Sequence, residues 1–257
     1  MGRMIILGSG TALPDRDRDN TFLAWDSGDG VLLIDCGGRA YQQLLRAGIE
    51  PASLRAVILT HAHPDHIYGL PALVFHLWLA GYQGTLTVRA NPPTLATTQR
   101  LCDALELQQK GHMCAVEWST IDDGGERLVE QTERYTISTM PVQHSVPCLA
   151  VKIIDATSGQ TIVYSSDTEP CPEVDQFAVG AHTLIHEATT AEPKPGLGHT
   201  TPRQAGEIAA RAGVERLVLI HFSAQYTMPE ADAVQQVRAA GFGGQVEIAR
   251  DLAEYVL

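Results

Sequence analysis

Four potential metal ligands stand together in the segment Thr60-His61-Ala62-His63-Pro64-Asp65-His66. An apolar run typical of a buried strand precedes this segment, and helical spacing of apolar residues follows it. The ligands are therefore predicted on a strand-to-helix loop. His61 and His63 alternate in an extended stretch, whereas Asp65 and His66 fall at the turn into the helix and can point elsewhere. This spacing suits two adjacent metal ions better than one.

The ligand chemistry indicates a catalytic metal site rather than a structural one. Imidazole and carboxylate ligands without thiolate are typical of catalytic zinc, where a position is kept for water, and they also accept manganese or iron. The five cysteines are an odd number and contain no C-x-x-C pair, so a disulfide framework or a thiolate zinc cage is not expected. Most of them are expected to be buried thiols. They are Cys36, Cys102, Cys114, Cys148 and Cys171.

One loop cannot complete the shells of two metal ions, so further ligands must come from other parts of the chain. His144, Asp167 and His221 each lie just past a predicted strand. Loops at one edge of a sheet commonly assemble active sites in this way. A carboxylate such as Asp167 is the natural group to bridge two cations. Taken singly, each of the three residues is equally compatible with a structural hydrogen-bonding role.

Strands precede helices in both halves of the sequence. In the first half, strands are predicted at 5–7, 22–25, 31–34 and 56–59, and helices at 70–77 and 94–107. In the second half, strands are predicted at 134–140, 148–154, 161–165, 182–186 and 217–220, and helices at 202–212 and 230–240. This order predicts an α/β fold, a four-layer αββα sandwich with helices on the outer faces of two sheets. Without repeats or linkers, one domain over residues 1–257 is expected.

The net charge and the distribution of apolar residues argue against two classes of partner, nucleic acids in general and membranes. Thirty acidic and eighteen basic residues give a net charge of −12, which opposes the broad basic surface of a general nucleic-acid binder. A run of about 18 apolar residues, as a membrane span requires, is missing, and the apolar stretch at the N-terminus is too short for a signal peptide. The sequence therefore predicts a cytoplasmic protein without membrane contact.

The ligand series resembles that of the metallo-β-lactamase superfamily, because His61-x-His63-x-Asp65-His66, His144, Asp167 and His221 occur in that order. The resemblance implies the metallo-β-lactamase fold and two Zn²⁺ ions. It also implies a division of the ligands: one ion is held by His61, His63 and His144, the other by Asp65, His66 and His221, and Asp167 bridges the two.

Within this superfamily the chain looks most like ribonuclease Z, the tRNA 3′-processing endoribonuclease. The finer match lies in His186-Glu187-Ala188-Thr189, in His199-Thr200-Thr201 and in His221-Phe222-Ser223. The resemblance implies that Glu187 and His199 form a proton-donating pair for the leaving oxygen, and that the protein is a homodimer. The alternative is that Glu187 and His199 only hydrogen-bond each other to hold a loop.

The sequence departs from ribonuclease Z in three places, one of which is Ala150-Val151, where the family has a Gly-Tyr pair. That family carries a long tRNA-binding arm between the third metal-binding histidine and the bridging aspartate, whereas His144 and Asp167 are only 23 positions apart. Gln225 also stands where the family usually has arginine. Together with the acidic charge, these changes favour a small nucleotide or RNA substrate over intact tRNA.

We therefore predict a di-zinc hydrolase that cleaves phosphodiester bonds by attack of a metal-bound hydroxide, a ribonuclease Z-like phosphodiesterase or nuclease. Asp65 is predicted to orient that hydroxide as well as to bind metal. Two alternatives stay open. The same site could hydrolyse carboxylic esters, thioesters, lactones or sulfate esters, or the chain could be a metal-binding scaffold without catalytic activity.

The remaining polar residues of interest are weaker candidates. His76, His182 and His186 are predicted to be structural. The basic residues that lie near the motifs in the sequence, and so are candidates for substrate contact, are Arg16, Arg18, Arg39, Lys194 and Arg203.

Overall fold

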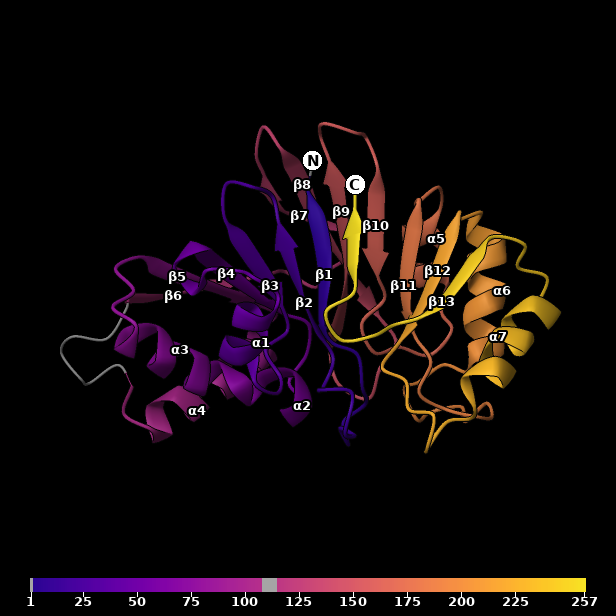
Figure 1. The fold of residues 1–257 in the computed structure, drawn as a ribbon, viewed down its shortest axis with the longest axis horizontal. Helices are drawn as coiled ribbons and strands as arrows, with labels where there is room; N and C mark the ends of the chain where they lie inside the picture. Colours follow the sequence, from indigo (N-terminus) through magenta and orange to yellow (C-terminus); the bar gives the residue numbers. More distant parts are fainter. Residues whose placement is uncertain (1, 108–114) are drawn as a thin grey trace. The chain divides into compact units, whose positions relative to one another are not determined.

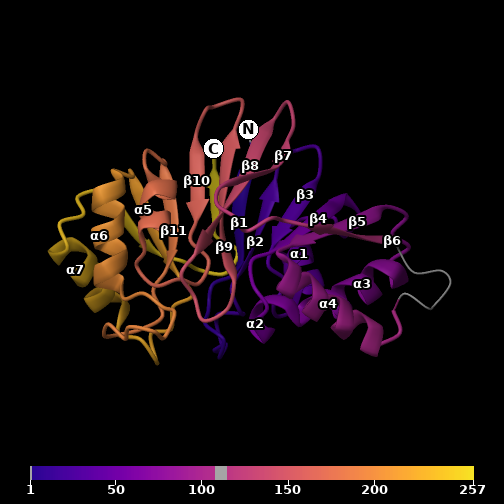
Figure 2. The same cartoon turned by 180° about the vertical axis from the view of Figure 1, so that it is seen from behind.

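The computed structural model describes residues 2–107 and 115–257, so Cys114 lies outside the described residues. The chain forms two compact units (Figures 1 and 2). Unit 1 comprises Met1–Asp122 and Arg250–Val256, and unit 2 comprises Asp123–Ala249 and Leu257. Whether they fold as the one domain expected from the sequence stays a prediction.

Unit 1 is built on a seven-stranded mixed sheet with the strand order β14-β1-β2-β3-β4-β5-β6. The strands are β1 (Arg3–Gly8), β2 (Phe22–Asp26), β3 (Val31–Ile34), β4 (Leu54–Leu59), β5 (Thr85–Ala90), β6 (Ala115–Thr120) and β14 (Glu254–Val256). Pairing is antiparallel from β14 to β3 and parallel from β3 to β6.

Helices of unit 1 cover one face of this sheet. They are α1 (Ala40–Arg46), α2 (Pro64–Ile67), α3 (Gly69–Leu79) and α4 (Pro92–Ala104), with a short 3₁₀ helix at Pro51–Ser53. Alternate strand residues such as Leu33, Val57 and Val88 pack against Leu44 and Leu73 in one buried core. The period of two along the strands places these apolar side chains on the same face, which is the face that the helices bury.

Unit 2 contains a second seven-stranded mixed sheet, in the order β13-β12-β11-β10-β9-β8-β7. Its strands are β7 (Arg127–Gln131), β8 (Tyr135–Val142), β9 (Cys148–Asp155), β10 (Thr161–Tyr164), β11 (Thr183–Glu187), β12 (Arg216–Ile220) and β13 (Gln245–Ile248). Pairing is antiparallel from β7 to β10 and parallel from β10 to β13. Strands β9 and β10 fill the interval between His144 and Asp167, where the sequence predicted that the arm is missing.

Three helices of unit 2, α5 (Pro172–Ala178), α6 (Pro202–Ala212) and α7 (Glu230–Ala239), bury apolar faces with this sheet. Helix α6 begins and ends where the sequence predicts. The Thr201 side chain accepts a hydrogen bond from the Gln204 backbone, the Gln204 side chain accepts one in return, and Gly213 ends the helix in the left-handed conformation. This capping box fixes the segment that leads from His199 into the helix.

Parallel strands bring the predicted site loops to common edges. In unit 1, the segments after β3 and β4 leave neighbouring parallel strands at their carboxyl ends. In unit 2, the segments after β10, β11 and β12 do the same. Crevices beyond the carboxyl ends of parallel strands are the usual place for ligands in α/β sheets. The topology of each unit therefore gathers its own share of the predicted ligands.

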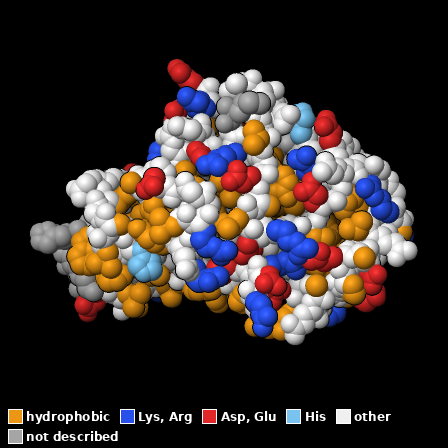
Figure 3. Space-filling view, in the orientation of Figure 1, with side chains coloured by type: hydrophobic (Ala, Val, Ile, Leu, Met, Phe, Trp, Pro, Cys, Tyr) orange, Lys and Arg blue, Asp and Glu red, His pale blue; other side chains and the backbone are white. Residues whose placement is uncertain are grey.

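Figure 3 shows hydrophobic side chains gathered over α3 and α4, at the left of the view. The large apolar side chains exposed in this region include Tyr68, Leu79, Leu101 and Leu105. Between the two helices lies an apolar hollow of about 490 Å³. Every helix among the described residues is too short or too polar to span a bilayer.

Helix α6 packs closely on α7 at Gly206, and this contact yields a test of the fold. A Cβ atom at Gly206 would lie 2.9 Å from the Cα of Val237 and 3.0 Å from its carbonyl oxygen. We expect Gly206→Ala to lower the free energy of unfolding by about 1–3 kcal/mol through overpacking, although alanine is the better helix former. Urea denaturation measures this change. Ala210→Gly, at an exposed position of the same helix, measures the difference in helix propensity between the two residues without the packing, about 1 kcal/mol. A Gly206→Ala protein more stable than wild type would contradict the close packing.

Candidate active site

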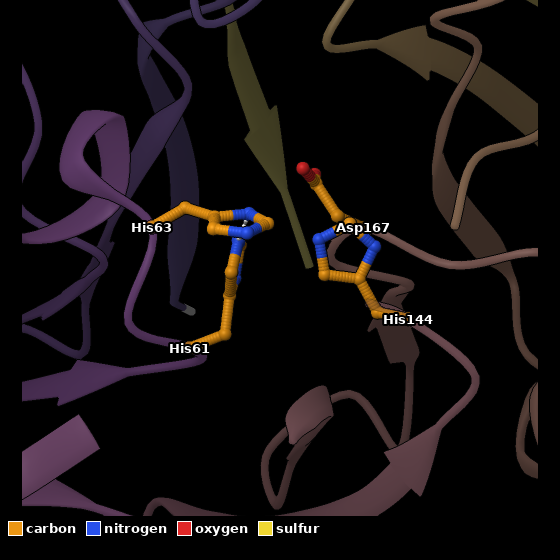
Figure 4. Close-up of side chains that lie close together, drawn as sticks. All are labelled: His61, His63, His144 and Asp167. Atoms are coloured by element: carbon orange, nitrogen blue, oxygen red, sulfur yellow. Dashed lines mark hydrogen bonds between the residues drawn. The ribbon is translucent and has the colours of Figure 1, made fainter. Parts of the chain in front are cut away.

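His61 and His63 bring two ring nitrogens together at the end of β4 (Figure 4). His61 Nε2 lies 3.1 Å from His63 Nδ1, while His61 Nδ1 is 3.0 Å from the hydroxyl of Thr60. Two nitrogen ligands of one tetrahedral zinc ion, at about 2.0–2.1 Å from the metal, are separated by roughly 3.3 Å. The spacing and chemistry of this pair therefore fit a single divalent ion.

Asp65 and His66 form a second pair of donors in the short helix α2. The Oδ2 atom of Asp65 lies 3.4 Å from His66 Nε2, again a spacing that fits two ligands of one ion. The rings of His61 and His66 are 4.0 Å apart between centroids. Unit 1 thus carries two neighbouring donor pairs, as the sequence spacing predicted.

A buried carboxylate, Asp35, fixes the orientation of this half of the site. It accepts hydrogen bonds from the Thr60 backbone at 2.8 Å, from the Thr60 hydroxyl at 2.9 Å and from His66 Nδ1 at 2.8 Å. The Thr60 hydroxyl donates its proton to Asp35. In the hydrogen bond between this hydroxyl and His61 Nδ1, the donor must therefore be His61 Nδ1. His61 and His66 then both present an unprotonated Nε2, the form that binds metal.

Asp35 and Thr60 hydrogen-bond the candidate ligands His66 and His61, and the sequence reasoning missed both residues. Asp35 lies just past strand β3, as His144, Asp167 and His221 lie just past their strands, and this signal could have found it. Its backbone has a positive φ of 65°, a conformation that costs a non-glycine residue energy and that recurs at functional sites.

Close backbone packing holds α2 against the segment after β3. Cys36 N donates to His66 O, and Gly69 N donates to Cys36 O, both at 2.8 Å. A Cβ atom at Gly37 would lie within 1.9 Å of the Asp65 carbonyl oxygen, so only glycine fits there. These contacts hold the backbone that carries Asp65 and His66.

In unit 2, Asp167 follows β10 and His221 follows β12, and His221 Nε2 lies 3.6 Å from Asp167 Oδ2. His144 Nδ1 is 2.6 Å from the carbonyl oxygen of Gly198, an acceptor that requires the proton on Nδ1 and leaves Nε2 as a ligand atom. Figure 4 shows the side chains of His144 and Asp167. The donors of unit 2 therefore also suit a divalent ion.

Glu187, at the end of β11, is the buried carboxylate of unit 2. Its oxygens accept hydrogen bonds from the backbone nitrogens of Thr168, Thr189 and Thr200 at 2.9–3.2 Å. They also accept from the Thr189 hydroxyl at 2.7 Å and from His199 Nδ1 at 3.0 Å. A carboxylate with these donors acts as an acceptor only, so its partner His199 carries the proton on Nδ1.

Thr189 extends this network to a predicted metal ligand. Its hydroxyl donates to Glu187 and lies 2.7 Å from His221 Nδ1. His221 Nδ1 must therefore carry the proton of that bond, which leaves Nε2 for metal. The arrangement repeats that of unit 1, where a carboxylate holds one histidine directly and a second through a threonine hydroxyl. The role of Thr189 was also missed, although Thr189 stands in the Glu187-Ala188-Thr189 motif.

Backbone strain and a glycine contact are concentrated around these residues. Ser166 and His221 have positive φ values of 53° and 50°. At Gly198, where φ is 84°, a Cβ atom would lie 2.5 Å from His144 Nδ1. The hydrogen bond that orients His144 therefore depends on glycine at this position.

His199 lies beside the donors of unit 2. Its ring stacks on that of His221 at 5.7 Å between centroids, and its Nδ1 is 4.0 Å from Asp167 Oδ2. One ligand atom from each of Asp167, His199 and His221 fits within 4.8 Å, so these three residues could also hold an ion. The bond from His199 Nδ1 to Glu187 is required both by the proton-donating pair that the resemblance implies and by the alternative in which the two residues only hold a loop, so the role of His199 stays a prediction.

Other histidines have structural surroundings, as the sequence predicts. His186 is fully buried and its Nδ1 lies 2.8 Å from the Glu187 carbonyl oxygen, and burial lowers the pKa of its imidazole. His182 Nδ1 accepts a hydrogen bond from Thr161 N. His76 packs against the ring of Tyr41.

Two of the candidate basic residues have structural surroundings. Arg18 is buried, and the side chain of Arg39 is paired with Asp19 at 3.2 Å. Four thiols, those of Cys36, Cys102, Cys148 and Cys171, are free and buried, as expected.

Comparison with known proteins places this geometry in a family. The family described as "Beta-lactamase superfamily domain" matches residues 31–222. Ribonuclease Z of Mycobacterium marinum is 27% identical over 271 residues, which cover 98% of this chain and 97% of the relative. The resemblance to ribonuclease Z is thus confirmed, and it supports the prediction of a metal-dependent hydrolase.

Solved structures agree with the predicted fold. The metallo-beta-lactamase fold protein YhfI from Bacillus subtilis is 25% identical, with a TM-score of 0.79 over 99% of this chain and 98% of its own. The short form of human tRNase Z is 22% identical, with a TM-score of 0.80 over 99% of this chain and 98% of its own. The chain therefore belongs to the beta-lactamase superfamily domain family and has the metallo-beta-lactamase fold, as predicted.

Proposed function

We propose that this protein is a di-zinc hydrolase that cleaves phosphodiester bonds in a nucleotide or RNA substrate. The observation that carries the proposal is the set of hydrogen bonds that the candidate histidine ligands make through the ring nitrogen that does not face the metal. In each unit a buried carboxylate, Asp35 or Glu187, directs histidine side chains so that one ring nitrogen of each stays available. Such outer partners typically accompany metal-binding histidines and fix their orientation.

The proposed ligands divide between two ions as the resemblance implies. His61, His63 and His144 would hold one ion, Asp65, His66 and His221 the other, with Asp167 shared by both. The 3.1 Å and 3.4 Å spacings of the two donor pairs in unit 1 support this division. When bound, the ions supply Lewis-acid stabilisation of charge on the phosphoryl oxygens and lower the pKa of water toward neutrality.

The other residues of the site would handle protons. His199, held by Glu187 through Nδ1, delivers a proton from Nε2 of its protonated ring to the leaving oxygen, because an alkoxide is a poor leaving group at neutral pH. Asp65 orients the attacking water in addition to binding metal. Glu187 keeps His199 and His221 in place through its hydrogen bonds.

The substrate is proposed to be smaller than intact tRNA. Ribonuclease Z relatives support phosphodiester chemistry. However, β9, a short turn and β10 occupy the interval between His144 and Asp167, where ribonuclease Z carries its tRNA-binding arm. A cytoplasmic location is part of the proposal, supported by the four buried free thiols.

Matched substrates test the reaction. With zinc or manganese bound, we expect turnover of bis(p-nitrophenyl) phosphate and of the dinucleotide ApA, and loss of both activities in Asp65→Ala and after metal removal by a chelator. His199→Ala should slow ApA by about 10²–10⁴-fold, as loss of a general acid does. It should slow the nitrophenyl ester much less, because p-nitrophenolate leaves without a proton. The measurement is kcat/KM for each substrate.

His76→Ala, outside the site, is the control for that series. Turnover of p-nitrophenyl acetate without any phosphodiester turnover would instead identify a carboxylic ester hydrolase. Zinc bound in stoichiometric amount, with no turnover of any ester, would identify a scaffold.

The Thr189 hydroxyl provides a test of the metal site that does not depend on activity. Thr189→Val keeps the shape of the side chain but breaks the link from Glu187 to His221. We expect it to weaken one of two zinc equivalents by about 10–100-fold, as loss of an outer-shell partner does. Thr189→Ser should keep wild-type affinity. Competition with a chromophoric chelator measures both.

Thr98→Val, which removes a buried hydroxyl that donates to Thr94 O in α4, is the matched control for that substitution. Equal zinc affinity in wild type and Thr189→Val would show that the hydroxyl does not position His221.

We propose a homodimer, as the ribonuclease Z resemblance implies, formed through the apolar surface over α3 and α4. Exposed apolar patches of this kind mark interaction sites. We expect light scattering to show a dimer, and Leu101→Glu with Leu105→Glu to give a monomer, because charges there would be buried without partners. Leu128→Glu, at an exposed leucine of unit 2, is the control. A monomeric wild type would refute the dimer. A double variant that stays dimeric would show that the interface does not lie over α3 and α4.

A further inference from the structure

A small hollow of about 190 Å³ opens beside His199 in unit 2. It is lined by Glu169, Lys194, His199, Gln204 and three prolines. Pockets that enclose a whole drug-sized ligand measure roughly 300–1,000 Å³, so this hollow suits one part of a substrate rather than all of it. Because His199 is the proposed proton donor to the leaving oxygen, the part nearest to it is the leaving group.

Lys194 and Gln204, which line this hollow, both carry hydrogen-bond donors. Among the described residues, no carboxylate lies within salt-bridge distance of the Lys194 ammonium group. The Gln204 side-chain oxygen accepts from the backbone and the hydroxyl of Thr201, so the group that Gln204 can still offer to a ligand is its amide N–H. An ammonium group and an amide N–H together favour an anionic oxygen.

Glu169 provides a hydrogen-bond acceptor in the hollow, in contrast to the donors of Lys194 and Gln204. Its Oε1 accepts from Gly198 N at 2.8 Å, whereas its Oε2 has only a long contact of 3.4 Å with the side-chain amide of Gln143. A carboxylate oxygen with this capacity favours a hydroxyl donor. The proline rings of Pro170, Pro193 and Pro195 provide stiff apolar walls without N–H groups.

We propose that this hollow binds the leaving alcohol of the reaction, and that this alcohol is a sugar that carries a second phosphate, as in a 5′-phosphorylated nucleotide. Lys194 and Gln204 bind the second phosphate, and Glu169 accepts from a sugar hydroxyl. The inference rests on the proposed phosphodiester hydrolysis and names its substrate class. The reaction is balanced: hydroxide from water adds to phosphorus, the bond from phosphorus to the sugar oxygen breaks, and that oxygen takes a proton from His199. The proton that water loses passes to solvent, from which His199 regains one.

The dinucleotides pApA and ApA separate this inference from the proposed function, because only in pApA does the leaving nucleoside carry a 5′-phosphate. We expect wild type to have the higher kcat/KM on pApA. Lys194→Met should lower kcat/KM on pApA by about tenfold or more, the effect of losing a charge-assisted hydrogen bond, and leave ApA unchanged. Lys194→Arg should restore most of the preference. Arg211→Met removes an exposed cation in the last turn of α6 that pairs with Asp175, and it is the control.

Product binding gives a second measurement that does not depend on turnover. Isothermal titration calorimetry with adenosine 5′-phosphate should show about tenfold weaker binding to Lys194→Met than to wild type, whereas adenosine should bind both equally. Equal rates on pApA and ApA, or a Lys194→Met protein with an unchanged preference, would overturn this inference alone. Failure to cleave bis(p-nitrophenyl) phosphate as well would overturn the proposed function and the inference together.

Discussion

The burial of a carboxylate beside histidine is the interaction on which the site depends. Asp35 and Glu187 are both fully buried, and a charge removed from water in this way is tolerated only when hydrogen bonds replace its hydration. Backbone N–H groups provide part of that replacement, and the rest comes from a threonine hydroxyl and a histidine ring. The bonds that make burial of each charge possible are thus the same bonds that set the tautomer of the histidines.

The fold makes these bonds possible by delivering the participants from neighbouring strands. In unit 1, Asp35 and Thr60 leave the parallel pair β3 and β4, and in unit 2, Glu187 and His221 leave the parallel pair β11 and β12. Parallel neighbours place their carboxyl ends side by side, so a residue after one strand reaches a residue after the next. Asp35 and His221 have positive φ values, so making this contact costs conformational energy in the backbone.

The sequence predicted the fold and the candidate residues more fully than the bonds between them. The H-x-H-x-D-H spacing stands out in the sequence because four potential ligands within six positions are rare in an ordinary loop. Asp35 and Thr60 do not, since single polar residues after a strand are common and only the paired register of β3 and β4 joins them. The C-terminal strand β14 was also missed. It is three residues long, and its pairing with β1 is a contact between the two ends of the chain that no local pattern can reveal.

The segment between Thr189 and His199 is fastened at both ends. Thr189 is bonded to Glu187, and at the other end Gly198 is bonded to Glu169 and His199 to Glu187. The interior, with its two prolines around Lys194, is exposed and makes few bonds to the rest of unit 2. Its length and composition can therefore diverge while the groups at its ends keep their positions. Within an otherwise constrained architecture, this stretch is where evolution, or an engineer, has the freedom to exchange one substrate preference for another.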